Sequence, residues 1–370
     1  PGTGTYTTTG STVVFNGTVS QTIPIFTSLT ANRSYNNLVI EGTGLYTPAR
    51  TWGGAGITNG ITGNLTLNGG QFEQTTTLGG VTLYINGDLN ITNANARFSQ
   101  HSGNLSNNNT YVLGNWIQSA GRFDFNTSVA GTGDGFVYLN RNLTATGGLI
   151  NCASTGSNTI NPTFAFDGTG VQNYTRTAGG NSFVDFVIGA NKSLLLLSNF
   201  SVTDGDIAVG TNATLDAQAF TVTTTDGGAS ADEFRTNVGS LIRTTHASGI
   251  VGMAPSGTRN FNTASIYEFY GTNQNTGFNT VPAITTAAQV IMNLSGTLTN
   301  TSASFTINSA LTLTSGTFNL GAANIINLGI GATVASVASN FIVGANAGTL
   351  NFIGSGTFTG IANPYNVYIN

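Results

Sequence analysis

The stretch NLTLNGGQF, residues 64–72, has a shape that returns four more times in this chain. Each copy begins with Asn, or once with Ala, and continues with an apolar residue. A Gly follows six positions after the start, and another apolar residue follows eight positions after it. The other copies are NWIQSAGRF from Asn115, NLTATGGLI from Asn142, NFSVTDGDI from Asn199 and ALTLTSGTF from Ala310.

The phrase predicts two strands joined by a tight corner. Leu65 and Leu67 alternate with polar residues, so they face the same side of a strand. The glycine that follows permits the backbone of a sharp corner. Phe72 then breaks the alternation, which requires a turn between two strands. We interpret each copy as one side and one edge of a coil.

A longer period supports a coiled architecture. YINGDL, YVLGNW and YLNRNL begin at Tyr84, Tyr111 and Tyr138, which are 27 residues apart, and the Asn-Leu step at Asn64 lies 24 residues before Asp88. A larger unit begins with FNGTVSQ at Phe15, FDGTGVQ at Phe166, FYGTNQN at Phe269 and FIGSGTF at Phe352. Regular repeats of this length are typical of solenoids.

We therefore predict an all-β solenoid, most readily a right-handed parallel β-helix with coils of about 24–27 residues. A single continuous solenoid should span residues 1–370. An array of immunoglobulin-like sandwiches is the rival architecture, but it requires domains of about 100 residues. Residues 216–257 are richer in Asp, Glu, Arg and His, and we expect a projecting loop or an irregular coil there.

The low charge content is explained by the stacking of coils, and it argues against nucleic-acid and membrane partners. Only 6% of the 370 residues are charged, because a charge at a repeat position would face its own copy on the next coil. The leading Asn fits a corner or an Asn ladder. Ten basic residues and a net charge of −4 argue against a nucleic-acid partner. The longest apolar run, LLLL from Leu194, is too short for membrane insertion.

Candidate chemistry is sparse. The candidate catalytic or metal-binding residues are the carboxylates Asp204, Asp206, Asp232 and Glu233, together with Arg235 and His246. We interpret the first two as solvent-facing corner residues, with a calcium site as the alternative, and the others as a solvated loop, with catalysis as the alternative. The other histidine is His101. We predict no enzyme activity, no catalytic residue, no metal site and no cofactor.

Aromatic residues and the single cysteine complete the set of candidates. Phe72, Phe123 and Phe318 occupy repeat positions and should stack in the core. Cys152 excludes an intrachain disulfide and should be buried. Trp52, in the Gly-rich stretch RTWGGAG, is the best single candidate for binding a sugar ring.

The order of these phrases resembles a known family. FNGT with a following Gln, then YNNLVI from Tyr35, then NLTL with its Gly and Phe, is similar to repeats of very large secreted surface proteins of Bacteroidetes. Those adhesin-like chains leave the cell through the type IX secretion system. The resemblance covers most of the chain, most closely 1–210 and 260–370. It implies an extracellular or cell-surface location and contact with secretion machinery during export.

The resemblance and the composition together predict a non-enzymatic stalk or adhesive segment, with surface or glycan ligands. One alternative is a carbohydrate-active β-helix enzyme or phage-type depolymerase. The other is a subunit of an extracellular filament, joined through open strand edges. The chain shows no signal peptide or sorting domain and stops within a repeat unit. We therefore expect the same chain to continue, or neighbouring subunits to sit, at the ends of the solenoid.

Overall fold

The computed structural model describes residues 10–24, 33–48, 60–74, 80–100, 108–127, 135–152, 162–225, 232–280, 282–336, 341–342, 348–359, 362–363 and 366–369. They form an all-β parallel solenoid with about 25 residues per coil, which confirms the predicted fold class. The right-handed sense of the coil stays a prediction. The chain divides into two compact units, residues 1–187 with 202–206 and 226–230, and residues 188–201 with 207–225 and 231–370.

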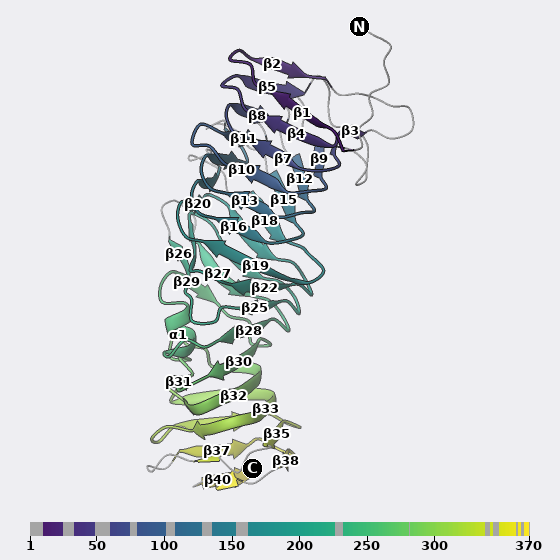
Figure 1. Ribbon diagram of the computed structural model, residues 1–370. Helices are drawn as coiled ribbons and strands as arrows, with labels where there is room; N and C mark the ends of the chain where they lie inside the picture. Colours follow the sequence, from purple (N-terminus) through teal and green to yellow (C-terminus); the bar gives the residue numbers. More distant parts are fainter. Residues whose placement is uncertain are drawn as a thin grey trace. The chain divides into compact units, whose positions relative to one another are not determined.

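In the first unit, successive coils add one short strand to each of three parallel sheets (Figure 1). The first sheet holds β1 (Thr12–Phe15), β4 (Asn37–Ile40), β7 (Leu65–Leu67), β10 (Leu89–Ile91), β13 (Trp116–Gln118), β16 (Leu143–Ala145) and β19 (Val171–Arg176). The second sheet holds β2 (Gln21–Ile23), β5 (Leu45–Pro48), β8 (Gln71–Glu73), β11 (Arg97–Ser99), β14 (Arg122–Asp124), β17 (Leu149–Asn151) and β20 (Gly180–Ser182). The third holds β3 (Arg33–Tyr35), β6 (Gly60–Ile61), β9 (Thr82–Ile85), β12 (Asn108–Val112), β15 (Gly135–Leu139) and β18 (Thr163–Phe166). Residues of both units occur in β21 (Asp185–Ile188) and β23 (Phe200–Thr203).

The nine-residue phrase forms the predicted strand, corner and strand. Its first copy comprises β7, the corner at residues 68–70, and β8, with Phe72 fully buried. Gly148 shows why the corner needs glycine. Its φ is +76°, and a Cβ there would lie 2.4 Å from the carbonyl oxygen of Ala120 on the preceding coil. Any other side chain would strain the backbone and push the coils apart.

Two copies of the phrase depart from this arrangement. The copy from Asn199 spans β23 and β24 (Ile207–Val209), which belong to the second and third sheets. The copy from Ala310 lies within a single long strand, β33 (Ser304–Asn319), with Gly316 at φ +86°. The phrase therefore encodes a bend between two runs of strand, whichever corner it occupies.

The core is built from the repeat positions. Phe72, Phe98 and Phe123 stack on successive coils, with ring centroids 5.1 Å and 4.7 Å apart. Phe318 and Cys152 are also buried, and Cys152 is a free thiol. These positions confirm the predicted core residues.

An asparagine ladder runs along the corner that precedes the first sheet. The side-chain oxygen of Asn37 accepts the backbone N–H of Asn64 at 2.9 Å, and that of Asn64 accepts the N–H of Asp88 at 2.8 Å. Asp88 and Asn142 continue the pattern toward Asn115 and Asn173 at 2.6 Å and 2.8 Å. The side-chain oxygen of each corner residue thus accepts a backbone N–H of the next coil without forming an ion pair. Asp88 can replace Asn in this ladder because its carboxylate supplies the same oxygen acceptor.

The second unit begins with the same three-sided pattern. Its strands are β22 (Ser193–Leu196), β25 (Thr214–Asp216), β28 (Leu241–Thr244) and β30 (Ile266–Gly271) in the first sheet, β26 (Val222–Thr225) in the second, and β24, β27 (Glu233–Thr236) and β29 (Thr258–Asn260) in the third. The later strands are β31 (Gln274–Asn275), β32 (Thr286–Thr299), β33, β34 (Ile325–Leu328), β35 (Thr333–Ser336), β36 (Phe341–Ile342), β37 (Thr349–Phe352), β38 (Thr357–Thr359), β39 (Ala362–Asn363) and β40 (Asn366–Ile369). The long strand β33 pairs in parallel with β34, β35 and β36, so it runs through positions that separate strands occupy on the next coil.

Residues 216–257 differ from the expected loop or irregular coil. They contain β26, β27 and β28, and the last two pair in register with β24 and β25. Phe234 and Ile242 are fully buried, so the apolar alternation persists, and the charged residues Glu233, Arg235 and Arg243 occupy the alternate, half-buried positions. The irregular element is the short helix α1 (Gly249–Met253). Residues 226–231 lie outside the described residues.

Candidate ligand-binding site

The carboxylates that the sequence singles out lie at the starts of two paired strands, since Asp206 directly precedes β24 and Glu233 begins β27, which pairs with β24. Asp204 is only 9% exposed, so the prediction that it faces solvent is wrong. Its φ is +52°. The reason is the tight corner, which folds Asp204 back onto the coil. The backbone N–H of Asp206 donates to Oδ1 of Asp185 at 2.9 Å. Trp52 and His101 lie outside the described residues.

The candidates in the second unit lie at two places, on or just before β27 and in the loop at His246 after β28. Asp232 is only 3% exposed, so the expectation of a solvated loop is wrong for it, because it leads directly into the packed strand β27. Glu233 and Arg235 form an ion pair of 3.4 Å along that strand, where side chains two residues apart share a face. Nδ1 of His246 accepts the N–H of Ser248 at 3.2 Å, within its own loop.

A charged ladder that sequence reasoning missed lies on the first sheet of the second unit. Arg243 lies between two carboxylates, 2.7 Å from Asp216 and 2.8 Å from Glu268. The Tyr270 hydroxyl donates to Asp216 at 2.5 Å, and the Arg243 guanidinium lies 4.8 Å from the centre of the Tyr270 ring. The hydrogen bond with Glu268 raises the pKa of Arg243, and burial, followed by the bond to Asp216, raises the pKa of Tyr270.

The second sheet of the first unit carries a similar cluster. Asp124, which is fully buried, binds Arg97 at 2.6 Å and Arg122 at 2.7 Å, and it accepts the side-chain amide of Asn151 at 3.2 Å. Arg97 and Arg122 are register partners, so two like charges lie on adjacent rungs. Asp124 offsets their repulsion. The spacing of 25 residues between the arginines is the signal that the sequence offered.

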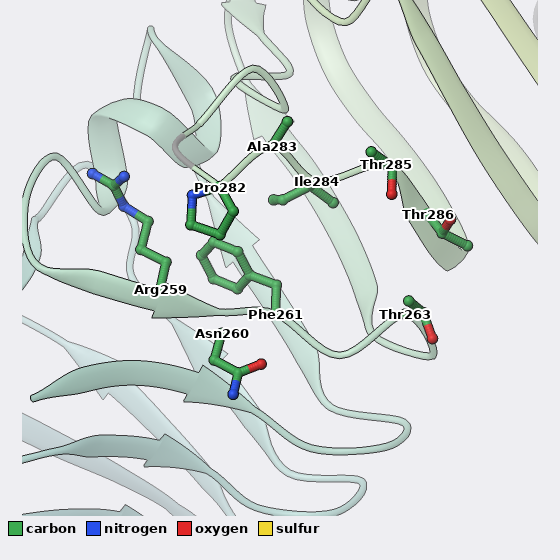
Figure 2. A pocket seen from close by; sticks show the side chains of 9 residues that line it. All are labelled: Arg259, Asn260, Phe261, Thr263, Pro282, Ala283, Ile284, Thr285 and Thr286. Carbon is green, nitrogen blue, oxygen red and sulfur yellow. The ribbon is translucent and has the colours of Figure 1, made fainter. Parts of the chain in front are cut away.

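A small hollow of about 130 Å³ lies beside β29 (Figure 2). Phe261, Pro282 and Ile284 form its apolar wall. The guanidinium of Arg259 points away from these three side chains, and its Nε donates to the carbonyl of Ala254 at 2.7 Å. Burial lowers the pKa of Arg259. The Arg259 guanidinium therefore binds the backbone of its own chain and does not point into the hollow.

A larger hollow of about 220 Å³ lies at the corner between the third and first sheets of the first unit. Its lining is mostly polar and consists of Leu113, Asn140, Arg141, Asn142, Thr169, Gly170, Val171 and Gln172. Seven residues, 167–173, separate Phe166 from Tyr174, whereas three, 140–142, separate their register partners Leu139 and Leu143 on the preceding coil, so the later corner is four residues longer. The mismatch between two stacked corners accompanies the hollow.

This long corner also explains the phrase FDGTGVQ. Its Gln172 is buried and turns back onto the corner, where its side-chain oxygen accepts the N–H of Gly168 at 2.8 Å. Its amide nitrogen donates to the carbonyls of Leu139 at 2.8 Å and Arg141 at 2.6 Å on the preceding coil. Gln172 thus closes the inner side of the hollow and holds Arg141 in place.

A tyrosine ladder leads along the third sheet to the same corner. Tyr84, Tyr111 and Tyr138 are half-buried and stack on β9, β12 and β15, which Figure 1 shows as successive rungs. Both ring pairs have centroids 4.6 Å apart, with planes inclined by 13° and 11°. Phe136 lies beside Tyr138 at 6.3 Å and 14°. The residue paired with Tyr138 on the next coil is Ala165, so the ladder ends at Tyr138.

Comparison with known proteins adds no relative. No protein-family model, no curated protein and no solved structure matches this chain. Within the described residues, no helix is long and apolar enough to cross a membrane. In the same part of the chain, no group of three or more His, Cys, Asp or Glu side chains is placed to hold a metal ion.

Proposed function

We propose that this chain is a non-enzymatic structural and adhesive segment of an extracellular bacterial surface protein. The observation that carries the proposal is the set of side-chain ladders between coils. Asn64, Asp88 and Asn142 each accept a backbone N–H of the following coil, and aromatic rings stack in the core and on the third sheet. Such repeated nearest-neighbour bonding suits an extended scaffold whose stability grows with each coil.

The charged clusters support a structural role over a catalytic one. A general acid or base must exchange a proton with its substrate. Asp124 and Asp216 instead use both of their oxygens for arginine, asparagine or tyrosine partners within the chain. Arg243 likewise binds Glu268 through two nitrogens. These groups fasten coils to one another.

The resemblance to Bacteroidetes adhesin-like repeats supports the location. The phrases that carry it, around Phe15, Tyr35 and Asn64, recur in the same order along the chain. We therefore propose export by a type IX route and display at the cell surface, where repeated weak contacts would add up by multivalency.

Two measurements test this function. Antibodies raised against the folded chain should label intact cells that produce it, and labelling only after permeabilisation would contradict an extracellular location. The purified protein should release no new reducing ends from a panel of bacterial and plant polysaccharides. Release that is lost in the Asp216→Asn variant would identify an enzyme instead.

A further inference from the structure

Arg141 differs from the other arginines whose side chains the structure describes. Those at 97, 122, 235 and 243 form ion pairs, and those at 176 and 259 donate to backbone carbonyls. Among the described residues, the exposed side chain of Arg141 has no hydrogen bond or ion pair. Arg141 therefore presents its guanidinium to solvent, whereas the other described guanidinium groups have partners within the chain.

The setting of Arg141 is a shaped polar hollow. Arg141 is the charged residue of the lining, which also includes the polar residues Asn140, Asn142 and Thr169. A volume of about 220 Å³ is smaller than a typical drug-sized pocket of about 300 Å³ or more, which suits one sugar residue. A guanidinium recognises a carboxylate through two parallel hydrogen bonds. The charge of the hollow therefore favours an anionic occupant.

The end of the tyrosine ladder lies beside this hollow. Tyr138 lies on β15, and Asn140 is the first residue after that strand. Side chains two positions apart in an extended chain face the same side, so those of Tyr138 and Asn140 do so. Asp167, which begins the long corner, acts electrostatically on Tyr138 and contributes with burial to its raised pKa, which places the corner close to the ring. Ala165 is too small to continue the stack. The nearly parallel rings of Phe136 and Tyr138 thus offer an apolar step next to a polar hollow.

We propose that Tyr138 and Arg141 form a binding site for a uronic-acid-containing glycan. One pyranose ring packs its apolar face against Tyr138, and the carboxylate of a neighbouring uronate residue binds Arg141 in the hollow. The inference rests on the adhesive part of the proposed function and names its ligand class.

The test begins with the wild-type protein on a printed array. The array carries uronate-containing oligosaccharides, the same oligosaccharides after reduction of the carboxyl groups, and sulfated oligosaccharides. We expect binding to a uronate-containing oligosaccharide and its loss on carboxyl reduction. Titration calorimetry with that oligosaccharide should show at least a tenfold weaker affinity for Arg141→Gln. Because Arg141 is exposed, this variant should keep the wild-type circular dichroism spectrum and melting temperature.

Two further variants separate the ring from the fold. Tyr138→Ala should weaken binding about tenfold, whereas Tyr138→Phe should retain it, because the ring face is kept. Tyr84→Ala removes a ring from the other end of the same ladder and should bind like the wild type. Failure of all uronates to bind, equal binding after carboxyl reduction, a preference for sulfated chains, or full affinity of Arg141→Gln would each overturn the site. A folded wild-type chain that binds no glycan and cleaves none would still fit the structural function.

Discussion

Tyr111 stacks face to face on Tyr138 from the neighbouring coil, with ring centroids 4.6 Å apart and planes inclined by 11°. The two residues are 27 positions apart and are register partners in β12 and β15. Their contact is the most direct link between the period of the sequence and the spacing of the strands. Burial, with a smaller electrostatic contribution from neighbouring groups, raises the pKa of both hydroxyls.

Those raised pKa values predict a loss of stability in alkali. A tyrosine whose pKa is raised on folding keeps its proton more tightly in the folded state. Its contribution is therefore complete below the unfolded pKa of about 10 and is lost as the pH rises through the folded pKa. The urea midpoint should fall above about pH 10, and it should fall less in Tyr111→Phe. Equal falls in the two proteins would contradict the assignment.

The core register predicts a severe effect of Phe123→Asp. Phe123 is fully buried between Phe98 and Trp116, and a carboxylate there has no partner. We expect a loss of more than about 4 kcal/mol in unfolding free energy, because a buried unpaired charge is among the most costly changes. Ile117→Asp, on the exposed side of β13, is the matched control and should cost little. Similar melting temperatures for both variants would show the register to be wrong.

The asparagine ladder predicts a smaller, measurable cost. Asn142→Ala removes the acceptor of the Asn173 N–H, which lies 2.8 Å away. A partly buried donor that loses its partner costs about 1–2 kcal/mol in unfolding free energy. Thr144→Ala, an exposed change on β16, which follows Asn142, should be silent in the same urea titration. If the two variants unfold alike, the ladder does not contribute to stability.

The charged ladder predicts coupling between adjacent coils. Replacing Arg243 by Met leaves the carboxylates of Asp216 and Glu268 without their cation. We expect a loss of about 1–2 kcal/mol, less than for a fully buried pair, because the Arg243 side chain is 31% exposed. A double-mutant cycle with Glu268→Gln measures the pair directly and should give a favourable coupling that weakens in high salt. Strictly additive variants would argue against it.

Two glycines on neighbouring coils predict effects of opposite sign. Gly148→Ala meets both a positive φ and a carbonyl oxygen at 2.4 Å, so it should destabilise the chain by more than about 1 kcal/mol. Gly170→Ala has nothing within 4 Å of the new Cβ and should stabilise it by about 0.4–1 kcal/mol. Thermal melts of the two variants compare them. Destabilisation by both changes would mean that the corner at Gly170 is not as open as described.

The local part of this fold was readable from the sequence. Alternation placed Leu65 and Leu67 on the buried face, and the glycine six residues after Asn64 marked the corner before Phe72. The tyrosine spacing predicted which strands stack. These features depend on backbone geometry within one coil and on a constant coil length, so neighbouring residues are sufficient to reveal them.

The candidate sites depend on contacts between coils, and the sequence did not indicate which charged residues make these contacts. Arg243 meets Asp216 and Glu268 because the register aligns residues about 25 positions apart, and no pattern distinguished them from other charged residues. Asp204 was expected in solvent, but the corner folds it inward. The hollow at Arg141 arises where a seven-residue connection, between Phe166 and Tyr174, stacks on a three-residue one, between Leu139 and Leu143. The sequence by itself determined the coil, because alternation and turns are local. Only the stacking of unequal corners decided which polar groups are paired and which face solvent.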